Sequence, residues 1–161
     1  MPATVLAAPF KYSAIGKDVY ICPTIATLTA PLRSELNAGT NIKLHLDKDT
    51  GLAGFELTHN TVTATSLGDG IGYVLNDGNA YGTATLTCHQ SKTGAASDVR
   101  SLLTEGATTY IVIFDTADTA GLRMDVFAVT VNPITKVRAG VAMLTIPVDI
   151  GNSARDVTVP A

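Results

Sequence analysis

Tyr110-Ile111-Val112-Ile113-Phe114 is an uninterrupted run of five hydrophobic residues, and it indicates the fold class. The run is too apolar for a strand with one face in water, so it predicts a strand that is buried on both faces. Asp115 to Gly121 follows with the residue types of a turn, and Arg123 to Val131 then has the pattern of a returning strand. Pro133 should end this second strand, because proline cannot donate a hydrogen bond to a sheet ladder. The sequence therefore predicts a mainly β protein.

Further strands are predicted on both sides of this pair. Lys17 to Cys22 forms one, and Thr83 to His89 forms another, in which apolar residues alternate with threonines. Lys136 to Ile150 is predicted as one long strand, which a polar break at Gly151-Asn152-Ser153 should end. The apolar register of this long strand is carried by Val137, Ala139, Val141 and Met143. Asp156 to Val159 is then expected to be an edge strand or part of a tail.

A hairpin is predicted between about Asn41 and Thr58. Its first strand has apolar residues at alternate positions, which are Ile42, Leu44 and Leu46. Asp47 to Gly51 has the composition of a turn, and Leu52 to Thr58 would form the returning strand. Beyond it, Thr61 to Thr65 is expected to be a short strand. Residues 66–80 are expected to be a loop or a weak hairpin, because Gly, Asp and Asn interrupt them.

Two helices are predicted. The main one covers about residues 97–105, with Ser97 as its N-cap and Gly106 just past its end. Its apolar stripe consists of Val99, Leu102 and Leu103. A shorter helix is expected near residues 30–37, capped by Thr29, with Leu32 and Leu36 facing inward. The expected architecture is thus a β-sandwich with one packed α-helix.

Length and composition favour one domain over residues 1–161. The 161 residues suffice for one hydrophobic core, and 46% of them are hydrophobic while 16% are charged. No internal repeat or Ser/Gly linker marks a boundary, although the ends, about residues 1–10 and 151–161, are expected to be flexible. We expect no additional C-terminal decoration domain.

Charge and motif content argue against several functional classes. A net charge of −3 leaves no excess of Lys or Arg to neutralise phosphates, which disfavours tight nucleic-acid binding. No window has the ~18 uncharged apolar residues of a membrane helix, and the N-terminus lacks the pattern of a secretion signal. Cys22 and Cys88 lie far apart without metal-ligand spacing, so both are expected to be free and buried.

We identify no catalytic motif in this sequence. The histidines His45, His59 and His89 have no nucleophile motif around them, and no zinc-protease pattern is present. Asp47 to Gly51 resembles the start of a calcium loop, but an apolar run replaces the acidic residue expected after its glycine. A solvated turn is the better interpretation. We expect no enzyme activity, no cofactor and no metal.

Strand edges are abundant, and several strands carry no lysine that would block pairing with another chain. Soluble monomers normally protect such edges, because exposed edges pair with other copies. The sequence therefore predicts a homo-oligomer.

Five motifs lie between Tyr20 and Val131, within a resemblance that covers about residues 10–150. Tyr20 to Thr24 has the pattern Y-x-x-P-T, and Pro31 to Thr40 has the pattern P-x-R-x-E-L-x-x-G-T. Asp98 to Leu103 reads D-V-R-x-L-L, and it is followed by the Y-I-V of Tyr110 to Val112. Gly121 to Val131 reads G-x-x-M-D-V-F-x-V-x-V and is the most specific. Together they resemble the major tail tube proteins of long-tailed, siphovirus-type actinobacterial bacteriophages.

The resemblance implies a structural virion protein. Its subunits would form hexameric rings, join their strands into an inner barrel and stack into the tail tube that delivers the genome. The implied partners are other copies of the chain, the tape-measure protein, and the tail-tip and tail-terminator proteins. Double-stranded DNA would pass without specific binding, and no membrane would be involved. The protein would be located in the virion tail, and in the host cytoplasm during assembly.

The resemblance also implies where stacked rings touch. The hairpin between about Asn41 and Thr58 would be the contact, with both chain ends as further candidates. The residues expected to carry this contact are Lys43, His45, Asp47, Lys48, Asp49 and Glu56. Repetition along a tube would make many weak contacts sufficient.

Other functions remain open at this point. A monomeric β-sandwich that binds surfaces or carbohydrates would need exposed aromatic residues, but the chain has five Tyr, four Phe and no Trp. A small hydrolase would need a nucleophile and a base. The inner tube of a contractile tail or injection device would share the expected fold.

Overall fold

The computed structural model describes residues 17–65, 72–81, 83–90, 98–138 and 140–161. Its strands are β1 (Val19–Cys22), β2 (Thr40–Asn41), β3 (Leu52–Ala53), β4 (Thr58–Thr65), β5 (Gly72–Ala80), β6 (Ala84–His89), β7 (Thr108–Phe114), β8 (Arg123–Val131), β9 (Thr135–Val137) and β10 (Met143–Thr158). The helical segments are α1 (Arg33–Asn37) and the 3₁₀ turn η2 (Val99–Leu102). The predicted mainly β class is confirmed. Among the described residues, no helix has the length and hydropathy to cross a bilayer.

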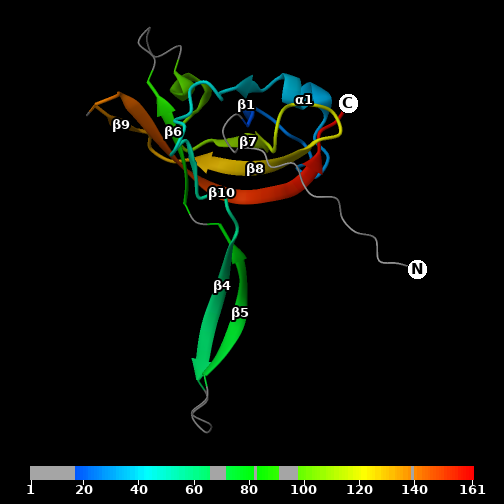
Figure 1. Cartoon of the computed structure of the whole chain (residues 1–161), viewed down its shortest axis with the longest axis vertical. Helices are drawn as coiled ribbons and strands as arrows, with labels where there is room; N and C mark the ends of the chain where they lie inside the picture. Colours follow the sequence, from blue (N-terminus) through cyan, green and yellow to red (C-terminus); the bar gives the residue numbers. More distant parts are fainter. Residues whose placement is uncertain (1–16, 66–71, 82, 91–97, 139) are drawn as a thin grey trace, which may run out of the picture.

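Eight strands form one antiparallel sheet in the order β2-β1-β7-β8-β10-β6-β3, with β9 also pairing with β10. The sheet curls around its core, so the layers expected of a β-sandwich are parts of one continuous sheet (Figure 1). Strands β4 and β5 form a separate two-stranded sheet that projects away from the curled sheet (Figure 1).

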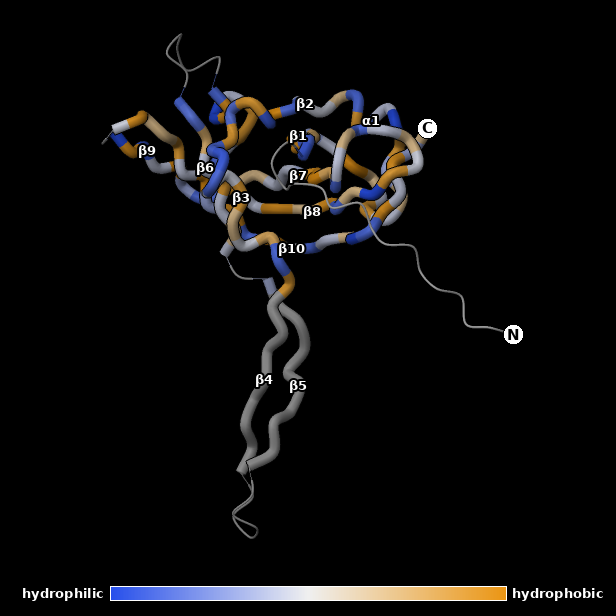
Figure 2. The backbone as a smooth tube through the Cα atoms, viewed as in Figure 1, coloured by the Kyte–Doolittle hydropathy of each residue, from blue (hydrophilic) through white to orange (hydrophobic). Residues whose placement is uncertain are grey.

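Two hydrophobic cores lie on opposite faces of β7, as the run Tyr110 to Phe114 predicts. Ile111 and Ile113 belong to the larger core inside the curl, which we call the inner core. Val112 and Phe114 belong to a second core on the other face, where Leu36 of α1 covers them. Figure 2 shows the hydrophobic residues concentrated along β7 and β8. The prediction that β7 is buried on both faces is therefore confirmed.

The C-terminal strand β10 is longer than the sequence suggests. It pairs with β8 from Val148 to Thr158, with register shifts after Ile150 and after Ala154. Two residues on the bulged strand can oppose one on its partner, which lets the strand continue through polar residues. The expected break at Gly151-Asn152-Ser153 is therefore wrong, and the end that was expected to be flexible, residues 151–161, is paired with β8 as far as Thr158. Residues 1–10, the other expected flexible end, lie outside the described residues.

The predicted strand Lys136 to Ile150 is interrupted by a turn. Gly140 adopts a positive φ of 73°, and β9 folds back onto β10 through the pair Thr135 and Thr145. Val137 and Val141 are 44% and 66% exposed, so their alternating pattern does not reflect a buried face. The prediction of one continuous strand is wrong here, and Ala139 lies outside the described residues.

The predicted α-helix at residues 97–105 is wrong, because only the 3₁₀ turn η2 forms. The chain becomes extended at Leu103 (φ −123°, ψ 136°), which places this side chain in the inner core. Gly106 then adopts a positive φ of 79° and donates from its N–H to the carbonyl of Val131. A helix continued to residue 105 would displace this turn, which aligns β7 with β8. Ser97 lies outside the described residues.

The short helix near residues 30–37 is confirmed as α1, but its expected cap is wrong. The helix begins at Arg33, and the carboxylate of Glu35 accepts hydrogen bonds from the N–H groups of Leu32 and Ala26 at 2.7 and 2.8 Å. A carboxylate near the N-terminus of a helix satisfies donors that the helix leaves free. Leu36 is fully buried, whereas Leu32 is 60% exposed, against the prediction for that residue.

A polar cluster fastens α1 and the β7–β8 turn to strand β1. Asp118 accepts hydrogen bonds from the guanidinium of Arg33 and, at 2.9 Å, from the hydroxyl of Tyr20. The Asp118 N–H donates to the carboxylate of Asp18, which also binds Lys43 at 3.3 Å. Partial burial opposes ionisation of Asp18, but hydrogen bonds from Asp118, Asn41 and Lys43 lower its pKa. The cluster joins segments that are distant in sequence.

Replacing Phe127 with alanine tests the inner core. Phe127 is 1% exposed and packs edge-on against Phe55 and Tyr81, with ring centroids 5.2 and 5.9 Å away. Phe127→Ala should lower the free energy of unfolding of the unassembled subunit by about 3–5 kcal/mol, because it leaves a cavity. Thr130→Ala, at an exposed position of the same strand, should change it by less than about 0.5 kcal/mol. Urea unfolding checks both, and equal effects of the two substitutions would contradict this packing.

Tyr20→Phe tests the polar cluster through its pH dependence. Burial, followed by the hydrogen bond to Asp118, raises the pKa of Tyr20 from 10.0 to about 12. A raised folded-state pKa stabilises the fold below pH 10, and this stabilisation is lost as the pH rises from 10 to 12. The variant should lose about 1 kcal/mol at pH 8 and show a smaller further loss than the wild type between pH 10 and 12. Parallel stability curves for the two proteins would contradict the assignment.

Candidate assembly interface

The segment 41–58 does not form the predicted hairpin. Residues 43–45 make a turn in which the N–H groups of His45 and Leu46 both donate to the carbonyl of Ile42. Ile42 and Leu46 therefore reach the inner core at a spacing of one turn, while Leu44 is 91% exposed. Strand β3, which was expected to pair with this segment, pairs with β6 instead. Ile42 and Leu46 are thus an i, i+4 pair that faces the core, and Leu44 between them is exposed.

The turn expected at Asp47 to Gly51 is confirmed, and Asp47 organises it. Its Oδ1 accepts hydrogen bonds from the Thr50 N–H and hydroxyl, each at 2.8 Å, and from the Asp49 N–H at 3.1 Å. The bonds from Thr50 are the main cause that lowers the pKa of Asp47. A Cβ at position 51 would collide with the Asp47 carbonyl oxygen, so the turn requires glycine there. These hydrogen bonds explain the presence of an aspartate at position 47, and the explanation needs no metal ion.

A large open groove runs beside this turn, and we call it the charged groove. It encloses about 830 Å³, and its floor is apolar, with Val19, Ile113 and Phe127 among its lining residues. Four cations and four carboxylates line it: Lys17, Lys43, Lys48, Arg155, Asp47, Asp49, Glu56 and Asp125. Exposed charges around an apolar floor are the composition of a protein interface with a polar rim.

Five of the six predicted contact residues meet in this groove, although the hairpin that was to present them does not form. They are Lys43, Asp47, Lys48, Asp49 and Glu56. His45 instead lines a separate pocket of about 130 Å³ beside η2. Sequence reasoning did not place Asp125 and Arg155 in this site. Their side chains lie 3.7 Å apart, and their approach depends on the bulged pairing of β8 with β10.

Residues 66–80 were expected to form a loop or a weak hairpin, and residues 72–80 form strand β5 of the projecting hairpin. Strand β5 spans Gly72–Ala80 and includes the expected turn residues 76–79. The register shifts between His59 and Thr61, so one residue of β4 opposes two of β5. A bulge of this kind absorbs the Asp-Gly pair that would otherwise favour a turn. Residues 66–71 lie outside the described residues.

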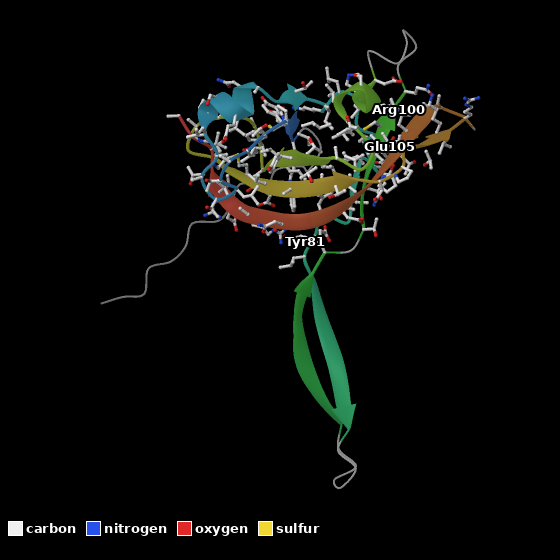
Figure 3. All side chains as sticks on the ribbon, turned by 180° about the vertical axis from the view of Figure 1, so that it is seen from behind. Tyr81, Arg100 and Glu105 are labelled. Atoms are coloured by element: carbon white, nitrogen blue, oxygen red, sulfur yellow. The ribbon has the colours of Figure 1, made fainter. Side chains whose placement is uncertain are left out.

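Tyr81 anchors the base of this hairpin to the curled sheet. Its hydroxyl oxygen lies 2.7 Å from the Oγ of Ser153 on β10, and its ring packs edge-on against Phe127. In Figure 3, Tyr81 lies between the sheet and the hairpin, away from Arg100 and Glu105 at the end that carries β9. The hairpin is thus fixed at its base while both of its strands leave the sheet.

Strand β10 has a long free edge next to this base. Strand β6 pairs with β10 only from Met143 to Val148, while β8 pairs on the opposite side as far as Thr158. Within the described ranges, no strand pairs with the β6 side of residues 149–158. A free edge of this length offers backbone donors and acceptors to a strand from another chain.

The remaining titratable groups form no other evident site in the part of the chain that the structure describes. No group of three or more His, Cys, Asp and Glu side chains there is placed to hold a metal ion. Cys22 and Cys88 are free and fully buried, and burial raises the pKa of their thiols to about 11 and about 12. Thiols that are buried and protonated are poor nucleophiles.

One family of known proteins matches the chain over most of its length. No curated protein matches the chain. The phage tail tube protein family matches residues 11–161, which include the curled sheet, the charged groove and the projecting hairpin. This match also agrees with the resemblance of the five sequence motifs. The chain belongs to the phage tail tube protein family and is a structural component of a phage tail.

Proposed function

We propose that the chain assembles into hexameric rings, which stack into a tube through which the genome is delivered. Family membership supports a tube in the virion tail. The six-membered ring and the long, non-contractile tail of an actinobacterial phage are supported by the sequence motifs alone. The role is structural, without catalysis or a cofactor.

The unpaired strand edges of the subunit carry this proposal. A two-stranded hairpin is only marginally stable alone in water, and β4 and β5 pair with each other while projecting from the sheet. The ten residues 149–158 of β10 offer a free edge of similar length to the eight and nine residues of β4 and β5. Pairing the hairpin of one copy with β10 of the next would satisfy both edges. Such a contact joins different surfaces of two copies and closes into a ring if the rotation permits.

The charged groove is the proposed contact between stacked rings. Its eight charged residues lie around an apolar floor, and Leu44 beside them is 91% exposed. Exposed hydrophobic residues in such a setting favour contact with another protein. The chain ends are additional candidates for this contact.

The proposed partners follow from the tube itself. A tape-measure protein would occupy the bore during assembly, and tail-tip and tail-terminator proteins would bind the two ends. Double-stranded DNA would pass later without specific binding. Assembly would take place in the host cytoplasm before the tail becomes part of the virion.

Shortening the hairpin tests the ring contact. A variant in which Asn-Gly replaces residues 61–76 should keep the curled sheet, because Tyr81 and the hairpin base remain. It should stay monomeric at concentrations at which the wild type forms tubes, since the strands that pair with the next copy are removed. Electron microscopy and light scattering measure this, with circular dichroism as the control for folding. A folded variant that forms normal tubes would contradict the role of the hairpin.

Charge substitutions test the groove. Asp49→Lys with Glu56→Lys reverses two exposed groove carboxylates, and Asp49→Asn with Glu56→Gln neutralises the same pair. Tube length should decrease from the wild type to the neutral variant and then to the reversed one, with little change in thermal stability. High salt should reduce the differences, because the charges are exposed. Equal tube lengths for all three proteins would exclude the groove from the ring contact.

A further inference from the structure

One face of the sheet, pointing away from the inner core, is lined by threonines. Alternating burial places Ala84, Leu86 and Cys88 of β6 in the inner core and leaves Thr85 and Thr87 on the other face. The same alternation on β10 leaves Thr145 on that face, beside Thr87 in the antiparallel register. We call this surface the hydroxyl face.

The hydroxyl face continues across two more strands. Asp149 of β10 pairs with Thr130 of β8, and Thr130 pairs with Thr108 of β7. All three of these residues are exposed. Four neighbouring strands therefore contribute to one surface, while α1 and its core cover a different part of the same side.

Among the residues that the structure describes, this surface carries no Lys or Arg. Strands β6 and β7 contain no Lys or Arg, nor does β8 after Arg123 or β10 before Arg155. Asp149 is its exposed charged residue. The cations in the described parts of the chain lie elsewhere, in the charged groove, around α1 or at the end that carries η2 and β9: Lys17, Lys43, Lys48, Arg155, Arg33, Arg123, Arg100, Lys136 and Arg138.

If DNA is to pass through a tube, the wall of the tube must not bind the DNA tightly. Each Lys or Arg that neutralises a phosphate releases counterions and strengthens binding, so a cationic wall would hold the DNA. A neutral hydroxyl group forms a weaker hydrogen bond to phosphate than Lys or Arg does, and it keeps water at the surface. A carboxylate repels phosphate. The hydroxyl face meets this demand, whereas the charged groove, with four cations, does not.

We propose that the hydroxyl face lines the bore of the tube and is the surface along which double-stranded DNA passes. The inference rests on the proposed tube, and it names the partner and the residues of its inner wall. Thr87, Thr145, Thr130, Thr108 and Asp149 form this wall in each subunit.

Cysteine labelling of assembled tubes tests the placement. Thr87→Cys and Thr145→Cys put a thiol on the hydroxyl face, while Cys22 and Cys88 stay unreactive because they are fully buried. In isolated subunits, the new thiols should react both with N-ethylmaleimide and with a maleimide attached to a folded protein too wide for the bore. In tubes, they should react with N-ethylmaleimide alone. Ser34→Cys on α1 serves as the comparison position on another surface, and the wild type is the blank.

Each result has a distinct meaning. Reaction of Thr87→Cys or Thr145→Cys tubes with the protein-linked maleimide would place the face outside and overturn the inference. Failure to react with N-ethylmaleimide would place it between subunits and also overturn it. Both of these results would leave the proposed tube intact. Absence of tubes from the wild type, even with tail-tip and tape-measure proteins present, would instead overturn the proposed function.

Charged variants test the consequence for DNA. In phage particles, Thr87→Lys with Thr145→Lys should slow genome ejection about tenfold at low salt, and high salt should restore the rate. Thr87→Gln with Thr145→Gln adds bulk without charge and should eject at nearly the wild-type rate. Equal ejection rates for the lysine and glutamine variants at low salt would overturn the inference.

Discussion

The antiparallel pairing of β10 with β8 is the interaction on which the rest of the structure depends. Strand β10, near the end of the chain, pairs with β6 and β9 in its first part and with β8 in its second part, and β8 in turn pairs with β7. The bulges after Ile150 and Ala154 let one strand serve both parts. Where β6 stops and β8 continues, no other described segment of the chain pairs with the free edge of the same strand. A strand that completes the fold of the subunit thereby also offers a place for another copy.

Local sequence signals predicted the strands with the most regular patterns. The apolar run at Tyr110 to Phe114 has no polar residue that could face water, so burial on both faces followed directly. The alternation in β6 and the turn residues before Gly121 were equally clear. These elements depend on short-range patterns and on composition. The pairing partners of these strands cannot be predicted from such local patterns, because register is set by contacts between distant segments.

The errors arose where tertiary contacts outweighed a local pattern. Ile42, Leu44 and Leu46 fit a strand, but a turn brings the first and last of them to the inner core. The stripe Val99, Leu102, Leu103 fits a helix, yet burial of Leu103 and the turn at Gly106 end it after η2. The Asp-Gly pair in β5 fits a turn, but a bulge accommodates it. Most residues of the predicted contact site still met in one groove, because the turn that Asp47 organises was identified correctly.

The proposed contact surfaces of this tail tube protein differ in the charge that they carry. Cations and carboxylates both line the charged groove, where contact with another protein is proposed. Threonines occupy the hydroxyl face, along which the passage of DNA is proposed. The hairpin and the edge of β10 offer backbone hydrogen bonds rather than charge. Assembly of the chain into a tube is best measured by electron microscopy of the purified, concentrated protein. We expect rings or hollow tubes of uniform width, whereas monomers at every concentration, even with tail-tip and tape-measure proteins added, would show that the chain does not form a tube.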